Sequence, residues 1–310
     1  MKRQKVVVQQ IYGGLGNQLF EYAFGRAFSL RNNAKLLIDP SRLLGWGRPQ
    51  NLSTRYYALE TVFSLSPNIF AAAKIQKYIP SPFLLNRVIY HHQAFPHFME
   101  KVGYWKYIED VDYLFNPQVF AFDFFNKIYF TGSWQSEKYF KDKEREIRSD
   151  LVFRHSLEGK QAAIAQEISS SKSVCLNVRR GDYVHNPIYA PMFNVCGQDF
   201  YKKAVDLMKR KIGEDIKIFV ISDEIEWCRD NLRIDEEHVF IGQEYYGDEF
   251  RDALHLMSLC KYFIIPNSTF AWWGAWLSKS SNKVVIAPKK WYGDFNIDTR
   301  DICPEEWIRI

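Results

Sequence analysis

The feature that most constrains the fold is a regular alternation of two kinds of segment after residue 173. Short apolar segments rich in β-branched residues alternate with longer segments whose apolar residues recur at helical spacing. Strands that alternate with helices in this way form a parallel sheet, so residues 156–310 are predicted to be an α/β domain. The apolar segments are SVCLNV, KIFVIS, HVFIG, YFIIP and KVVIAP, and the helical ones are DFYKKAVDLMKRKI, DEIEWCRDNL, DEFRDALHLMSLC and NSTFAWWGAWLSK.

A β–loop–α–β pattern opens the chain and predicts a second, doubly wound domain over residues 1–155. A short β-rich run, KVVVQQIY, leads into the glycine-rich GGLGNQ, then a helical segment and a second strand, KLLID. Residues 40–110 are irregular and contain several prolines, which predicts an irregular insert. The charged, helical stretch 141–170 marks the expected domain junction.

Composition excludes several classes of protein. With 47% hydrophobic and 25% charged residues, the 310-residue chain is typical of a globular protein with a sizeable core. The net charge of +5 comes without a run of Lys or Arg, so no nucleic-acid partner is predicted. The five cysteines are far apart and form no CxxC pair, which predicts neither a zinc site nor disulfides and favours a cytoplasmic location.

No stretch of the sequence is apolar for long enough to form a transmembrane helix, and the first apolar run is too short for a signal peptide. Basic residues near the start leave open a peripheral attachment to the inner face of the membrane: Lys2, Arg3 and Lys5.

The glycine-rich loop resembles a dinucleotide-binding fingerprint only in part. Gly14 and Gly16 match its first two glycines, but Leu19 stands where the third is required. Asn17 and Gln18 bring amide groups to a helix N-terminus, where they can bind sugar hydroxyls or a phosphate. The alternative interpretation is a tight strand-to-helix turn capped by Asn17.

Two adjacent arginines, Arg179 and Arg180, follow the strand SVCLNV directly. In open parallel sheets, ligands bind beyond the carboxyl ends of the strands. The planar guanidinium group matches phosphate oxygens, and neighbouring residues of an extended chain point in opposite directions. One arginine is therefore expected to reach a ligand while the other pairs with Asp182. The alternative is a purely structural Arg–Asp network.

Two further strand ends carry polar residues that suit a nucleotide. Asp223 and Glu224 follow KIFVIS and suit ribose hydroxyls or a guanine edge. Asn267, Ser268 and Thr269 begin a helix, where unpaired backbone N–H groups favour an anion. Together with the arginines, these residues predict a site for a nucleotide diphosphate. Three tryptophans in the same helix share one face and are expected to be core: Trp272, Trp273 and Trp276.

Four motifs together resemble the α-1,2-fucosyltransferase family: GGLGNQLFEYAFGRA, VRRGDYV, FVISDEIEWC and NSTFAWWGAWL. They span residues 13–277. The resemblance implies the GT-B architecture, with two Rossmann-like domains that face a cleft. It implies inverting transfer of L-fucose from GDP-β-L-fucose to the 2-hydroxyl of a terminal galactose. No metal or other cofactor is implied, because GDP-fucose is a co-substrate. The first domain would bind the acceptor and the second GDP-fucose.

The resemblance also implies roles for individual residues. Arg179 and Asp182 are the predicted catalytic residues, with Arg179 as the main stabiliser of the leaving group and Arg180 as its alternative. Asn177 stands where the family usually has histidine, so no histidine base is expected there. The general base is left open among Asp39, Glu21 and Asp182. The predicted donor-binding residues are Asn177, Arg179, Arg180, Tyr183, Asp223, Asn267, Ser268 and Thr269, and the predicted cleft loop comprises Gly14, Gly16, Asn17 and Gln18.

Three alternatives remain at this stage. The donor can be another GDP-sugar, since strand-end motifs specify the phosphates better than the sugar. A metal-dependent transferase would use the D-x-D motif of Asp110–Asp112, because hard divalent cations prefer carboxylate ligands. A non-catalytic sugar- or nucleotide-binding protein is the third. The acceptor is expected to be a galactose-terminated oligosaccharide or lipid-linked glycan, recognised mainly by residues 40–130.

Overall fold

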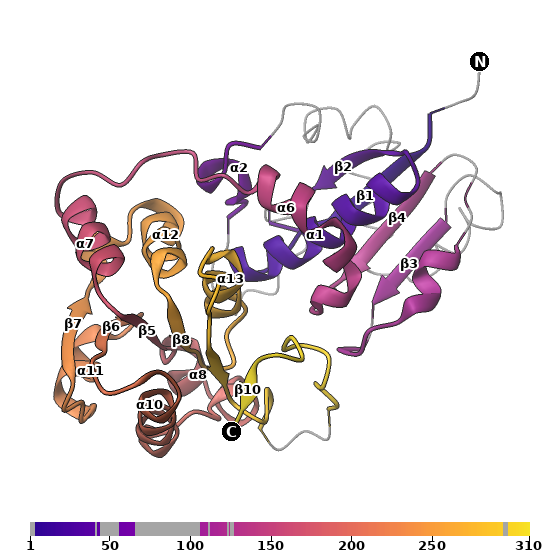
Figure 1. Ribbon diagram of the computed structural model, residues 1–310. Coiled ribbons are helices and arrows are strands. Elements are labelled where there is room, and N and C mark those ends of the chain that lie inside the picture. The colour runs from indigo at the N-terminus through magenta and orange to yellow at the C-terminus, as the bar shows by residue number, and fades with distance from the viewer. Residues whose placement is uncertain are drawn as a thin grey trace. The chain divides into compact units, whose positions relative to one another are not determined.

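The computed structural model describes residues 4–40, 42–43, 56–65, 106–110, 112–122, 124, 127–293 and 297–310. The chain divides into two compact units, Met1–Arg154 and His155–Ile310 (Figure 1). Each unit contains one sheet whose paired strands all run parallel. Most of the predicted insert, residues 40–110, lies outside the described residues.

The first unit is built on a four-stranded sheet of order β2-β1-β4-β3. Its central strand β1 is buried at all five positions, as expected for a strand covered on both faces. Helix α1 packs against β1, and its Phe24 stacks on Trp134 at 3.7 Å between ring centroids. The elements are β1 (Val6–Gln10), α1 (Leu15–Arg31), β2 (Lys35–Asp39), α2 (Leu59–Val62), β3 (Lys106–Asp110), η1 (Pro117–Ala121), β4 (Lys127–Gly132), η2 (Glu137–Tyr139), η3 (Lys141–Lys143) and α6 (Glu144–Asp150).

The second unit is built on a six-stranded sheet of order β10-β9-β8-β5-β6-β7. Its core combines the buried strands with the apolar face of α10, whose Tyr201, Ala204 and Met208 recur at helical spacing. The elements are α7 (Gly159–Ser170), β5 (Ser173–Val178), α8 (Gly181–His185), α9 (Ala190–Phe193), α10 (Gln198–Ile212), β6 (Lys217–Ser222), α11 (Ile225–Asn231), β7 (Glu237–Ile241), η4 (Gln243–Tyr245), η5 (Asp248–Phe250), α12 (Arg251–Leu259), β8 (Tyr262–Ile264), α13 (Thr269–Leu277), β9 (Val285–Ala287) and β10 (Ile308–Arg309).

The strand order gives each sheet a point where the chain reverses its direction of winding. In the second unit, β6 and β7 lie on one side of β5, whereas β8, β9 and β10 lie on the other. Ligands of doubly wound folds bind beyond the strand ends at such a point, which here lies between β5 and β8. In the first unit the corresponding point lies between β1 and β4.

Most predicted elements of the second unit agree with the structure. The strands SVCLNV and KIFVIS have the predicted bounds, and Trp272, Trp273 and Trp276 are buried as expected. In the alternative interpretation of the glycine-rich loop, Asn17 caps α1. The structure differs in this detail, because Gly14 is the N-cap of α1 and no side chain caps this helix. Strands β3 and β10 were not predicted, because β3 adjoins the irregular segment and β10 has only two residues.

Candidate active site

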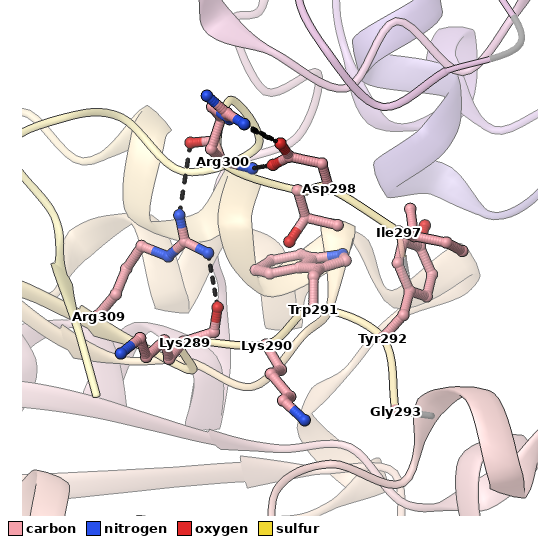
Figure 2. Close-up of a pocket in the computed structure, with 10 residues that line it drawn as sticks. Lys289, Lys290, Trp291, Tyr292, Gly293, Ile297, Asp298, Arg300 and Arg309 are labelled. Atoms are coloured by element: carbon pink, nitrogen blue, oxygen red, sulfur yellow. Dashed lines mark hydrogen bonds and ion pairs between the residues drawn. The ribbon is translucent and has the colours of Figure 1, made fainter. Parts of the chain in front are cut away.

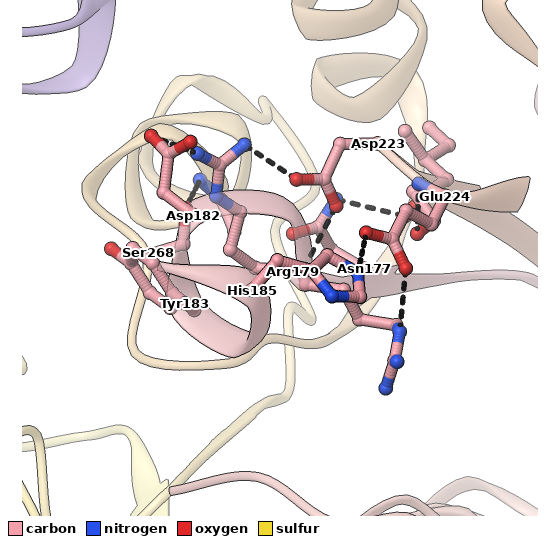
Figure 3. Close-up of polar contacts among 12 residues, drawn as sticks. Asn177, Arg179, Asp182, Tyr183, His185, Asp223, Glu224 and Ser268 are labelled. Carbon is pink, nitrogen blue, oxygen red and sulfur yellow. Dashed lines mark hydrogen bonds and ion pairs between the residues drawn. The ribbon is translucent and has the colours of Figure 1, made fainter. Parts of the chain in front are cut away.

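The arginine pair lies at the carboxyl end of β5, beside the point where the second sheet reverses its winding (Figure 3). Arg179 Nη1 forms an ion pair with Asp223 Oδ2 at 2.8 Å, and Nη2 lies 3.5 Å from Asp182 Oδ2. The Arg179 side chain is 25% exposed. Its guanidinium group is therefore held in one direction by two carboxylates and remains accessible at the edge of the sheet.

Arg180 is held by a different set of contacts. Its backbone N–H donates to Asp223 Oδ1 at 2.9 Å, and its Nε donates to Glu224 Oε2 at 2.9 Å. The guanidinium carbon lies 3.6 Å from the centroid of the Trp227 ring, in a cation–π contact. His185 Nε2 lies 2.6 Å from the other Glu224 oxygen. Both arginines are thus paired with acids, whereas the sequence predicted that only one would be.

The two acids of this cluster titrate differently. Burial raises the pKa of Asp223, and the charge of Arg179 and the N–H of Arg180 offset it only in part. Burial also pushes the pKa of Glu224 upward, but the hydrogen bonds from Arg180 and His185 outweigh it and hold the pKa below its usual value. Glu224 is therefore a fixed anion that anchors Arg180, whereas Asp223 takes up a proton more readily.

The carboxyl end of β8 faces the same point of the sheet, but Asn267 has a structural task there. Its side chain is buried, and Nδ2 donates to the carbonyls of Phe193 at 3.0 Å and Trp291 at 2.9 Å. Ser268 is the N-cap of α13 and accepts a hydrogen bond from the N–H of Ala271. Both N–H groups of the Asn267 amide are used within the protein, so this amide does not donate to a ligand.

Asn177 and Tyr183 are also fixed by internal contacts. Asn177 is buried, and its Nδ2 donates to the carbonyl of Ile221 on β6 at 3.0 Å. The Tyr183 hydroxyl donates to the carbonyl of Asn267 at 3.3 Å, and its ring stacks on Phe193 at 4.7 Å. Both residues thus tie the strand ends of the site together.

The glycine-rich loop occupies the equivalent point of the first unit, after β1. Gly13 has a φ of +74°, a conformation that favours glycine, whereas Gly14 begins α1 with an extended backbone. Gln18 is buried; its Nε2 donates to the carbonyls of Gly13 and Tyr56, and its Oε1 accepts from the N–H of Ala58. Gln18 therefore joins residues 56–58 to the loop instead of presenting its amide to a ligand.

Asn17 and Gly16 complete the predicted cleft loop. Asn17 is half-buried, and its Oδ1 accepts a hydrogen bond from Gln135 at 3.3 Å, so this loop contacts the segment after β4. Gly16 is buried within the first turn of α1.

Of the three candidate bases, only Asp182 is substantially exposed, at 34% of its side chain. Asp39 is buried and accepts a 2.6 Å hydrogen bond from the Tyr129 hydroxyl. Glu21 is completely buried and accepts the N–H of Tyr12 at 2.9 Å. Burial raises the pKa of Glu21 well above its usual value, and the nearby Arg42 offsets this only in part. Glu21 therefore takes up a proton more readily than an exposed glutamate.

The raised pKa of Glu21 leads to a stability prediction for the first unit. Because folding raises the pKa of Glu21, this residue makes folding less favourable as the pH rises above the pKa that Glu21 has in the unfolded chain. Glu21→Gln should therefore abolish this loss of unfolding free energy with rising pH. Glu21→Ala should instead destabilise by about 1–3 kcal/mol, because the N–H of Tyr12 loses its acceptor. Urea unfolding at several pH values measures both effects, and equal pH dependence of wild type and Glu21→Gln would contradict the prediction.

The D-x-D motif lies at the end of β3, where Asp110 is engaged by the backbone. Its Oδ2 accepts the N–H of Trp134 at 2.9 Å, and burial raises its pKa to about 7. Trp134 has a φ of +50°, so Asp110 stabilises a tight turn after β4. Within the described part of the chain, no group of three His, Cys, Asp or Glu residues could hold a metal ion.

Comparison with known proteins decides the family. The model of glycosyl transferase family 11 matches residues 6–310, almost the whole chain. The chain belongs to this family. An α-1,2-colitosyltransferase of Escherichia coli is 31% identical, over 98% of this chain and 99% of that protein. The rat galactoside α-(1,2)-fucosyltransferase 2 is 30% identical over 35% of this chain and 30% of its own length.

The solved structures support the fold. The α-1,6-fucosyltransferase NodZ of Bradyrhizobium, crystallised with GDP, matches with a TM-score of 0.53 and 15% identity over 89% of this chain and 93% of its own. The predicted GT-B class, with two parallel α/β sheets, is thereby confirmed. The chain is a glycosyltransferase of family 11, as the four motifs indicated.

Sequence reasoning missed two members of the arginine cluster. His185 pairs with Glu224, and Trp227 stacks on Arg180. His185 lies in α8, seven residues after the end of β5, and Trp227 lies in α11, five residues after the end of β6. Their closeness in sequence to the predicted residues was the only available signal.

The close approach of α8 to Asp223 leads to a second prediction. A Cβ atom added to Gly181 would lie 2.6 Å from Asp223 Oδ2, so Gly181→Ala must displace the carboxylate that holds Arg179. A misplacement of about 1 Å in a catalytic site can cost about 10²-fold in rate, and we expect a loss of this order in kcat. Gly197→Ala is the matched control, because no atom lies within 4 Å of its added Cβ. Equal activity of the two variants would show that this contact is unimportant.

Proposed function

We propose that the chain is a galactoside α-1,2-fucosyltransferase that transfers L-fucose from GDP-β-L-fucose to the 2-hydroxyl of a terminal galactose. The observation that carries the proposal is the position of Arg179, held by Asp223 and Asp182 where the second sheet reverses its winding. A fixed guanidinium at this point suits a diphosphate. The names of the two relatives, a colitosyltransferase and a galactoside fucosyltransferase, support the α-1,2 linkage and the galactose acceptor.

In the proposed reaction the acceptor oxygen attacks the anomeric carbon of fucose from the face opposite GDP. The bond between this carbon and the β-phosphate oxygen breaks, its electron pair leaves with GDP, and the configuration inverts. Negative charge then grows on the β-phosphate. Arg179 stabilises this charge more in the transition state than in the ground state, and the positive end of the α13 helix dipole adds to this stabilisation. Arg180, anchored by Glu224, orients the loop.

The acceptor hydroxyl loses its proton to a carboxylate in this scheme. Asp182 is our choice, because it is exposed, whereas Glu21 and Asp39 are buried. The second unit, residues 156–310, would bind the donor, and the first, residues 1–155, the acceptor. Among the described residues no helix is long and apolar enough to cross a membrane.

A second donor is favoured by one specific observation. The relative that matches this chain over 98% of its length is a colitosyltransferase, and colitose is L-fucose without its 3-hydroxyl. The arginine cluster would bind the GDP moiety of either donor. The two donors differ only in a hydroxyl that a site must hydrogen-bond in order to select fucose.

The deciding experiment measures GDP release with a β-galactoside acceptor in excess EDTA. GDP-fucose and GDP-colitose are supplied separately and then in competition. The proposal is supported if GDP release from GDP-fucose depends on the acceptor and its kcat/KM is at least equal to that for GDP-colitose. If kcat/KM is higher for GDP-colitose, colitose is the transferred sugar instead of fucose. Release that requires Mn²⁺ would restore the D-x-D alternative, and hydrolysis or binding without transfer would refute the transferase assignment for these donors.

A further inference from the structure

His185 is the histidine of the arginine cluster, and the proposed reaction gives it no task. It is the last residue of α8, and its side chain is 62% exposed. Its Nε2 lies 2.6 Å from Glu224 Oε1 (Figure 3). Histidine is the side chain that changes its charge between about pH 5 and pH 8. A titratable group therefore contacts the acid that holds Arg180.

Glu224 divides its two oxygens between two basic side chains. Oε1 lies beside the imidazole of His185, and Oε2 accepts the Nε of Arg180 at 2.9 Å. Glu224 is also the N-cap of α11, and His185 ends α8, so each residue stands at the helix terminus that favours its charge. The lowered pKa of Glu224 keeps this carboxylate ionised. A protonated His185 therefore has a fixed negative partner at hydrogen-bond distance.

The position of Glu224 decides the direction in which Arg180 points. The carboxylate holds Nε of Arg180, while the guanidinium carbon lies 3.6 Å from the centroid of the Trp227 ring. The backbone N–H of Arg180 donates to Asp223, and the same carboxylate pairs with Arg179 at 2.8 Å. A displacement of Glu224 would thus move Arg180 and, through the shared loop, the arginine beside it. His185 restrains the second oxygen of Glu224 against such a displacement.

The charges of the cluster balance only when His185 carries a proton. Its two arginines face three acids, Asp182, Asp223 and Glu224. When all three acids are ionised and His185 is neutral, the cluster has one excess negative charge. Asp182, one turn earlier on α8, is paired with Arg179, and helix α9, which packs against α8, has no titratable side chain. Protonation of His185 therefore removes the excess.

We propose that His185 is a positioning residue for the donor: in its protonated form it holds Glu224, and thereby Arg180, for the diphosphate of the nucleotide sugar. The inference rests on the proposed function, because it assumes that the arginine pair binds this diphosphate. A neutral His185 leaves a negative excess that repels the anionic donor, so donor binding weakens as the pH rises. The effect falls on KM for the donor and not on kcat, because the charge acts equally on the bound donor and on the transition state.

The test measures KM for the donor in His185→Gln and in wild type, at about pH 5.5 and about pH 8.5. Glutamine keeps a hydrogen-bond donor for Glu224 but carries no charge at either pH. We expect the ratio of KM in the variant to KM in wild type to be about 2–5 at the lower pH, the size of one exposed charge pair, and about 1 at the higher pH. Both proteins contain Asp223, so its titration cancels in the ratio.

Two further variants separate charge at this position from a general effect of substitution. His185→Lys keeps a positive charge at both pH values, so its KM should stay low where that of wild type rises. His238→Gln is the matched control. His238 is exposed, and its Nδ1 lies 2.8 Å from the Glu236 carbonyl oxygen, but it lies near the amino end of β7, at the opposite edge of the sheet. KM of this control should follow that of wild type at each pH.

Three results would overturn the inference and leave the proposed function intact. An equal KM ratio for His185→Gln at both pH values shows that the proton on His185 has no role. A loss confined to kcat shows that His185 does not act through donor binding. If His185→Lys has the same KM profile as His185→Gln, charge at this position is irrelevant.

If neither donor is transferred to a galactoside, the proposed function fails, and binding tests His185 alone. Calorimetry then gives Kd for GDP of wild type and the three variants at the same two pH values. The terminal phosphate of GDP titrates in this range, but its contribution cancels when proteins are compared at one pH. A Kd ratio of His185→Gln to wild type that falls from about 2–5 to about 1 with rising pH supports the inference. A constant ratio, or absence of GDP binding to wild type, overturns it.

Discussion

Arg179→Ala is expected to lower kcat for glycosyl transfer by about 10²–10⁴-fold, the range found when one stabiliser of transition-state charge is removed. Arg179 is the guanidinium held at the sheet edge by Asp223 and Asp182, where the leaving β-phosphate of the proposed donor would lie. The effect on KM for the donor should be smaller, because the contact strengthens as the bond to the sugar breaks. Initial rates of GDP release at saturating acceptor measure both parameters.

Two controls separate a catalytic role of Arg179 from a structural one. Arg179→Lys keeps the charge but loses the planar fork, so it should recover only part of the rate. Arg180→Ala removes the neighbouring guanidinium and its contact with Trp227, and we expect a smaller loss of kcat than for Arg179→Ala. If Arg180→Ala is the more damaging change, the assignment of the two arginines must be exchanged. Near wild-type turnover of Arg179→Ala would reject the leaving-group role.

Asn267→Ala is expected to destabilise the second unit by about 2–4 kcal/mol, because two carbonyls would each lose a hydrogen-bond donor. Asn267 Nδ2 donates to Phe193 and Trp291, and these contacts hold α9 and the loop after β9 against the end of β8. Urea unfolding followed by tryptophan fluorescence measures the loss. Hydrogen exchange should locate it, with faster exchange in residues 189–194 and 289–293.

Ser268→Ala is the matched control for Asn267. This change removes the N-cap of α13 but leaves both carbonyls bonded, so it should cost only about 1 kcal/mol. The family resemblance implied a role for Asn267 in binding the donor, and the experiment distinguishes the two interpretations. Unchanged stability of Asn267→Ala together with much weaker GDP binding would favour the ligand role over the structural one.

The alternation of strands and helices in the second unit was predictable because it depends on local pattern. The run KIFVIS is apolar at its four central positions, as a strand covered on both faces requires, and the segment that becomes α10 has one apolar face. For the same reason, the sequence showed that Arg179 and Asp223 follow β5 and β6 directly and that Ser268 comes shortly after β8. In a parallel sheet, all carboxyl ends meet at one edge.

The sequence by itself therefore determined the α/β class, the family and the set of polar residues at the sheet edge. Only the tertiary structure decided what each residue does there. Gln18 and Asn267 have amide groups that suit a ligand, yet both are used by carbonyls, those of Tyr56 and Trp291, that are distant in sequence. A cavity lined by Lys289 and Arg309 (Figure 2) likewise combines the loop after β9 with β10. A buried polar group must be satisfied by whichever partner packing places beside it, and this partner is fixed by the fold and not by spacing along the chain.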